Sequence, residues 1–218
     1  MNQNISELKN KCNKMVEEFY FNGRELKSTE LKNYTSGDGE NDGLECLFEN
    51  IIKEIVSNLS LDDRIEISNE YLGDKSSEDE DPQRLDIHVM VDNKALLMIE
   101  SRAWIDKPFY TLKRAVIKNI RELEHTKKYL HDDCEFILLS LAIDVKDRLR
   151  KSLDKTQGHG ELIKEFTISP YRRGYKKKNY FYFGHKAEEV DKLVEFVYNK
   201  LLNYKNRNLY KAQEEIYA

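Results

Sequence analysis

Two apolar runs between residues 84 and 104 flank the polar segment Asp92-Asn93-Lys94, which is the pattern of a β-hairpin with a short loop. Side chains alternate between the two faces of a strand, so Glu100 and Arg102 share one face of the second arm. A three-residue turn at this loop would place Asp86 of the first arm directly opposite Glu100. Directly opposed like charges destabilise a sheet, and a divalent cation between the two carboxylates is one arrangement that would offset their repulsion.

Four segments repeat apolar residues at the spacing of an amphipathic helix. One of them covers residues 111–130, and Asp42 followed by Glu45 predicts a capping box at the start of another. The tail beyond Asn206 is expected to fray. The buried stripes of the other three helices are predicted to be Ile5, Leu8, Cys12, Met15, Val16 and Phe19; Leu44, Leu47, Phe48, Ile51, Ile52 and Ile55; and Val190, Leu193, Val194, Val197, Leu201 and Leu202.

Strands are predicted on both sides of the hairpin. Residues 64–72 alternate apolar and polar side chains, and residues 134–143 form a nearly continuous apolar run, as expected of a strand buried on both faces. Residues 166–183 predict two more strands. The resulting order of helix, strand, hairpin, helix and buried strand indicates an α/β fold with a mixed central sheet flanked by helices. Residues 1–218 show no internal repeat or linker and are interpreted as a single domain.

Composition narrows the class of protein further. The chain is 39% hydrophobic and 35% charged, enough apolar material for a core beneath a highly charged surface. It has no apolar stretch long enough to span a bilayer and no apolar signal-peptide core near its N-terminus. Its three cysteines lack metal-ligand spacing. We therefore expect a reduced, cytoplasmic protein with no membrane partner.

The net charge of −4 hides an asymmetry between the two halves of the chain. Residues 1–100 contain 11 Lys and Arg against 23 Asp and Glu, whereas residues 101–218 contain 25 against 17. A basic half indicates a nucleic-acid partner, although solvated faces of unequal composition would give the same numbers. The candidate DNA-binding residues intermix cations with aromatic side chains, and a solvated basic turn is the alternative interpretation: Arg172, Arg173, Tyr175, Lys176, Lys177 and Lys178.

The order of the elements and the acidic pair on the hairpin resemble the PD-(D/E)xK nuclease superfamily, which includes most type II restriction endonucleases. The family motif is an Asp, a variable gap, then Glu or Asp, any residue, and Lys. Asp86, Glu100 and Arg102 occupy the matching positions, with Arg102 in place of the lysine and Leu85 in place of the proline. The resemblance implies a restriction-endonuclease-like αβββαβ core over about residues 42–143. Residues 144–218 would then form a DNA-contacting and dimerisation extension.

The resemblance also implies a site and a chemistry. Asp86 and Glu100 would hold Mg²⁺, a hard ion that prefers oxygen ligands, and Glu49 on the preceding helix would add a further metal ligand in preference to Glu45. Arg102 would be the third catalytic residue. It could orient the attacking water or hold a phosphate, but it could not act as a base.

The sequence therefore predicts a Mg²⁺-dependent, sequence-specific endonuclease that cuts double-stranded DNA as a homodimer. One alternative is a catalytically inactive nucleic-acid-binding module on the same scaffold, which the replacement of lysine by Arg102 favours. A repair or transposition nuclease of the same superfamily is another. The plainest alternative is an exposed charged hairpin face with an Arg–carboxylate pair. His88, on the Asp86 face, and His159, in a Gly-flanked loop, are further candidates for contact with DNA.

Overall fold

The computed structural model describes residues 2–23, 43–61, 63–68, 86–104, 129–142, 163–168 and 184–217. The helix predicted over 111–130 therefore falls largely outside the described residues, as does everything predicted within 144–162. The described elements, in chain order, are α1 (Asn2–Gly23), α3 (Leu44–Asn58), β1 (Ile65–Ser68), β2 (Ile87–Val91), β3 (Lys94–Trp104), β4 (Leu130–Ala142), β5 (Ile163–Ile168) and α6 (Ala187–Tyr217).

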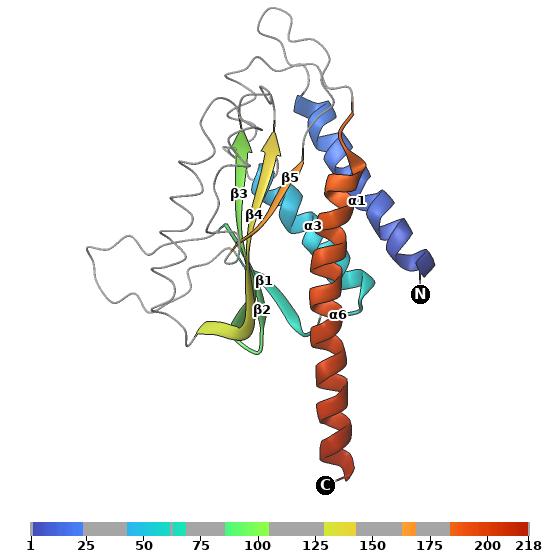
Figure 1. Ribbon diagram of the computed structural model, residues 1–218, viewed down its shortest axis with the longest axis vertical. Coiled ribbons are helices and arrows are strands. Elements are labelled where there is room, and N and C mark those ends of the chain that lie inside the picture. Colours follow the sequence, from blue (N-terminus) through green and yellow to red (C-terminus); the bar gives the residue numbers. More distant parts are fainter. Residues whose placement is uncertain are drawn as a thin grey trace, which may run out of the picture.

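The five strands form one mixed sheet in the order β1-β2-β3-β4-β5. The first three strands pair antiparallel, and β3, β4 and β5 pair parallel. Helices α1, α3 and α6 lie together on one side of this sheet (Figure 1). The predicted α/β fold with a mixed sheet and packed helices is thus confirmed at this level.

The main core fills the space between the three helices and the sheet. The predicted stripes are confirmed: every residue of the α3 stripe is buried, and Ile5, Met15 and Leu202 are the partly exposed members of the other two. The sheet contributes alternate residues of its central strands, namely Ile87, Val89, Val91, Leu97, Ile99, Ile137 and Leu139. Removing this apolar surface from water is the main stabilising term of such a core.

The opposite face of the sheet is also buried along its central strands. Ala95 and Met98 of β3 are 0% exposed, and Met90, Leu130, Cys134 and Phe136 pack against them. Strand β3 therefore buries side chains on both faces while it pairs with a neighbour on each side, which accounts for its nearly continuous apolar sequence.

The hairpin turns through two residues, not the predicted three. Asp92 and Asn93 have φ values of 50° and 61°, and Val91 pairs with Lys94. Positive φ at both central positions is the signature of a type I′ turn, whose twist matches that of the flanking strands. Asn and Asp tolerate this conformation better than other residues with a side chain do.

A β-bulge restores the register that the sequence predicted. Met90 pairs with Ala95 but Val89 pairs with Leu97, so Leu96 is the extra residue on β3. Leu96 and Leu97 both pack into the helix-side core, as expected of a bulge in which two residues oppose one. Beyond the bulge Ile87 pairs with Ile99, which is the predicted alignment.

Several predicted boundaries are wrong. The cap residue of α3 is Gly43, which makes no side-chain hydrogen bond, so the capping box from Asp42 does not form. Strand β4 begins at Leu130, not at residue 134, because Asp132 and Asp133 distort the strand without ending it. Helix α6 continues to Tyr217 instead of fraying after Asn206. Within the described ranges, no helix is both long and apolar enough to cross a bilayer.

A polar network joins α1 to the start of α6 and to β5. Nε2 of His185 donates to Oδ1 of Asn13 at 2.8 Å, and Nδ2 of Asn13 donates to Oδ1 of Asp191 at 2.9 Å. The ring of His185 stacks on that of Tyr20, whose hydroxyl donates to the carbonyl of Ile168 at 3.3 Å. Burial of the ring favours a neutral His185, because desolvation disfavours the charged imidazolium.

We predict that His185 makes folding stability depend on pH. Burial lowers the pKa of His185 from its usual value of 6.5, and the nearby Glu17 and Asp191 oppose this shift only in part. The unfolded chain therefore binds a proton more readily, so stability should fall as the pH drops below about 6.5 and level off below the folded-state pKa. Urea unfolding from pH 7.5 to 5.5 measures this, and His185→Gln should flatten the profile. Parallel profiles for the two proteins would contradict the prediction.

We predict that the turn depends on its left-handed residues. Asn93→Ala should lower the free energy of unfolding by about 1 kcal/mol, because a left-handed conformation is unfavourable for Ala. Asn93→Gly is the matched control and should be at least as stable as the wild type, since Gly adopts positive φ freely. Equal urea midpoints for the Ala and Gly variants would contradict this account of the turn.

Candidate functional site

Four polar side chains stand out within the described core because they are buried among apolar ones. Asp86 is 9% exposed, His88 1%, Glu100 1% and Ser101 4%. All four lie on β3 or at the start of β2, toward the open end of the hairpin. Carboxylates are almost never buried to this degree unless they are paired or bind a cation, because desolvating a charge is costly. The clustering of these four buried polar side chains therefore indicates a candidate functional site.

The register of the hairpin brings these residues together. Ile87 pairs with Ile99, so the next position outward sets Asp86 across from Glu100. Val89 and Ile99 pack into the helix-side core, and alternation therefore directs His88 and Glu100 to the other face of the sheet. The sequence predicted an exposed or metal-bridged acidic pair. The burial of both carboxylates contradicts the interpretation of an ordinary exposed charged face.

Asp86 is anchored by Ser101, a residue that the sequence analysis did not single out. The backbone N–H of Ser101 donates to Oδ2 of Asp86 at 2.6 Å, and the Ser101 hydroxyl donates to the same oxygen at 2.8 Å. Asp86 lies just before β2, and its side chain supplies a hydrogen-bond acceptor to the backbone of β3 beyond the last described pair of the β2–β3 ladder, Ile87 with Ile99. The only signal in the sequence was a hydroxyl residue between Glu100 and Arg102.

For the other predicted site residues, the structure describes the side chain of Glu49 and only the strand position of Arg102. Arg102 belongs to β3 and pairs with Ser140 in the parallel ladder, but its side chain is outside the described part. Glu49 lies on α3 and forms an ion pair with Lys53 at 2.5 Å. Helix α3 packs on the face of the sheet opposite to that of Glu100, so Glu49 as a third metal ligand stays a prediction. The predicted DNA-binding residues 172–178 and His159 lie outside the described residues.

The carboxylate pair fits a magnesium ion in one specific way. In the part of the chain that the structure describes, no three His, Cys, Asp or Glu side chains are grouped to hold a metal. Mg²⁺ commonly uses only one or two protein carboxylates and completes its octahedron with water and substrate phosphate oxygens. Asp86 and Glu100 therefore suit an ion that is shared with a phosphate-bearing substrate better than a permanently enclosed ion.

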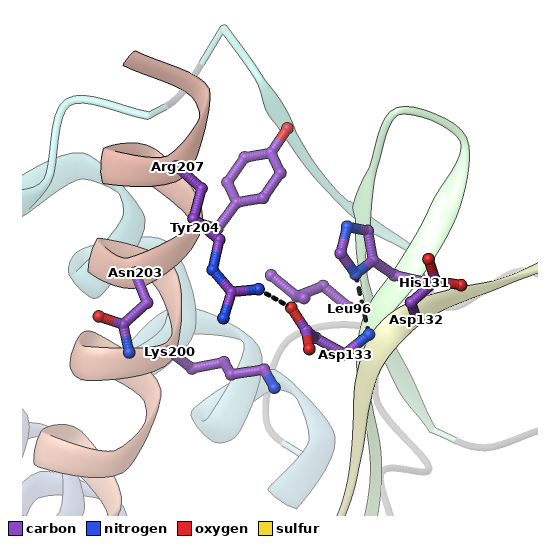
Figure 2. A pocket seen from close by; sticks show the side chains of 8 residues that line it. All are labelled: Leu96, His131, Asp132, Asp133, Lys200, Asn203, Tyr204 and Arg207. Carbon is purple, nitrogen blue, oxygen red and sulfur yellow. Dashed lines mark hydrogen bonds and ion pairs between the residues drawn. The ribbon is translucent and has the colours of Figure 1, made fainter. Parts of the chain in front are cut away.

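A separate pocket of about 350 Å³ lies between α6 and the start of β4 (Figure 2). It exists because the β3–β4 ladder is interrupted: Ala95 pairs with Leu130 and Leu97 with Glu135, which leaves residues 131–134 opposite the bulge at Leu96. Its lining is Leu96, His131, Asp132, Asp133, Lys200, Asn203, Tyr204 and Arg207.

The charges of this pocket are largely neutralised across it. Arg207 forms an ion pair with Asp133 (Figure 2). Lys200 forms an ion pair with Glu135 at 3.5 Å. The hydroxyl of Tyr204 donates to Oδ2 of Asp92 at 3.1 Å. Leu96 and Ser101 are five residues apart on β3, or about 16 Å. The pocket is therefore distinct from the buried carboxylates, and its contacts serve to dock α6 onto the sheet.

No protein-family model matches the chain, and neither a curated protein nor a solved structure matches it significantly.

Nucleophilic chemistry by the two most buried thiols is disfavoured. Burial raises the pKa of Cys12 to about 12, and burial likewise raises the pKa of Cys134 to about 12, although Lys200 acts in the opposite direction on the second. The thiolate is the reactive form of cysteine. Near neutral pH both residues are therefore thiols.

We predict that Cys12 and Cys134 are protected from thiol reagents while the protein is folded. In a Cys46→Ser variant, which removes a half-buried thiol, labelling by a disulfide reagent at pH 8 should be at least about tenfold slower in buffer than in denaturant. A native rate equal to the denatured rate would contradict the protection.

Proposed function

We propose that this protein is a Mg²⁺-dependent endonuclease that hydrolyses phosphodiester bonds of double-stranded DNA on a restriction-endonuclease-like αβββαβ core. The observation that carries the proposal is the pair of buried carboxylates, Asp86 and Glu100, at facing positions of the central hairpin. Burial of both at facing positions is destabilising in the absence of a cation or other compensation. A role in metal binding gives a reason for this arrangement.

The topology supports the same proposal. Helix α3 is followed by the antiparallel strands β1, β2 and β3, and then by β4 in parallel with β3. This order is compatible with an αβββαβ core. A parallel pair requires a crossover connection, and the sequence predicts a helix between β3 and β4, outside the described residues.

The residues of the site suit hydrolysis by water. Bound Mg²⁺ supplies charge stabilisation at the phosphate and acidifies a coordinated water. Asp86 and Glu100 would ligate this ion, and Arg102, always protonated, would orient the water or bind a phosphate oxygen. Glu49 is the candidate for support of a further ion. His88 lies on the face of Glu100, two positions from Asp86, and would be a candidate to contact a phosphate group bound there.

The proposed partner is double-stranded DNA bound by a homodimer. Two-fold dimers are the commonest oligomers and match palindromic DNA sites, which would give sequence specificity. The basic residues from Arg172 to Lys178 would neutralise phosphates, so binding should weaken as salt rises. The alternative of an inactive DNA-binding module is favoured by one observation, the arginine at position 102.

We predict that cleavage requires both carboxylates and a divalent ion. Asp86→Asn and Glu100→Gln should each lower cleavage of a long linear DNA by at least about a hundredfold, because each removes a metal ligand but preserves shape. The matched control is Glu66→Gln, an exposed carboxylate on β1, which should cleave like the wild type. The assay compares Mg²⁺ with EDTA on a gel.

The cleavage products separate the candidate functions. Discrete bands that disappear with EDTA support a sequence-specific enzyme, whereas a smear or selective cutting of branched DNA supports a repair or transposition nuclease. Binding of DNA without cutting by the wild type would favour the inactive module. Full activity of Asp86→Asn would end the assignment of the site.

A further inference from the structure

We propose that Ser101 is a positioning residue that holds the Asp86 carboxylate in a metal-binding orientation and sets its separation from Glu100. This inference deepens the proposed function and rests on it for the nature of the site. The contacts of Ser101 themselves come from the structure.

Both polar groups of Ser101 that can donate a hydrogen bond converge on one oxygen. Its N–H and its hydroxyl reach Oδ2 of Asp86 at 2.6 and 2.8 Å, and both residues are buried. Rotation of the Asp86 carboxylate would break both hydrogen bonds inside a region of low dielectric, where such losses are most costly. The orientation of the carboxylate is therefore fixed by Ser101, and neither of these bonds uses Oδ1.

The anchor also links the two carboxylates to each other. Ser101 directly follows Glu100 on β3, and Ile99, directly before Glu100, pairs with Ile87. The backbone of Glu100 is thus tied to the opposite strand on both sides, through Ile87 and through Asp86. Any shift of Asp86 relative to Glu100 would have to break either the hairpin ladder or the two Ser101 hydrogen bonds. Small displacements of a positioned group can change rates by large factors.

A strand-end cap is the competing explanation of the same contacts. In that case Asp86 would only satisfy the N–H of Ser101, which lies beyond the last described pair of the β2–β3 ladder. A cap needs the N–H of Ser101 but not its hydroxyl. The hydroxyl is thus the group that distinguishes positioning from capping.

The test compares Ser101→Thr with Ser101→Val in the full-length protein. Thr and Val have the same shape, so packing and strand propensity are matched and only the hydroxyl differs. Two measurements are made on each variant: binding of Mn²⁺, followed by the paramagnetic resonance signal of the free ion, and the Mg²⁺ concentration that gives half-maximal DNA cleavage. Thermal unfolding reports whether both variants fold.

The Thr variant should bind Mn²⁺ like the wild type, and the Val variant about tenfold more weakly, with a similar increase in the half-saturating Mg²⁺ concentration. Equal Mn²⁺ binding by the two variants would overturn the positioning role and leave Asp86 as a cap. Mn²⁺ binding that is strong in the wild type and weak in the Val variant, without any DNA cleavage, would support Ser101 and reject the nuclease. Absence of Mn²⁺ binding by the wild type, both alone and in the presence of DNA, would overturn both proposals.

Discussion

Strand β3 is the element on which the rest of the sheet depends, because it is hydrogen-bonded on both edges and buried on both faces. It pairs antiparallel with β2 and parallel with β4, so it marks the change of direction within the mixed sheet. Every side chain described from Ala95 to Ser101 is buried, and only Glu100 and Ser101 among them are polar. A position with so little access to water tolerates a carboxylate only with a compensating function or partner. The proposed metal site therefore involves Glu100 and Ser101, the two polar residues of this buried segment.

Helix α6 contacts the turn end of the β2–β3 hairpin. The hydroxyl of Tyr204 donates to Asp92 in the turn, the ammonium of Lys205 donates to the carbonyl of Leu59 just after α3, and Arg207 pairs with Asp133 on β4. These contacts connect the turn, the end of α3 and the irregular part of β4 to one helix. The two ends of β3 thus differ in kind. The end at Glu100 and Ser101 carries buried polar groups. At the turn end, partly exposed hydrogen bonds and ion pairs connect the hairpin and β4 to α6.

Much of this arrangement could be predicted from the sequence, since the hydrophobic pattern of a chain reports burial directly. The apolar stripe of α3 followed from periodicity, and the burial of Ile137, Leu138 and Leu139 on the two faces of β4 followed from an unbroken apolar run. The alignment of Ile87 with Ile99, next to Asp86 and Glu100, was also predicted, although on the basis of a wrong turn length that the bulge at Leu96 offsets. Neither the bulge nor the two-residue turn is visible in a binary pattern, because Asp92 and Asn93 fit turns of either length.

The features that were not predicted depend on the positions of individual side chains in the folded structure, which the hydrophobic pattern does not report. Asp132 and Asp133 are typical turn residues, yet they lie within β4, in the short segment where its ladder with β3 is interrupted opposite Leu96 and resumes at Glu135. In the sequence, nothing distinguishes Ser101 from other strand serines, because its distance to Asp86 is a property of the folded chain.

The bulge also decides which face of the sheet carries Glu100. A regular hairpin with this two-residue turn and no bulge would put Glu100 on the helix side, away from the face of His88. The extra residue at Leu96 is therefore what keeps Glu100 on the same face of the sheet as His88.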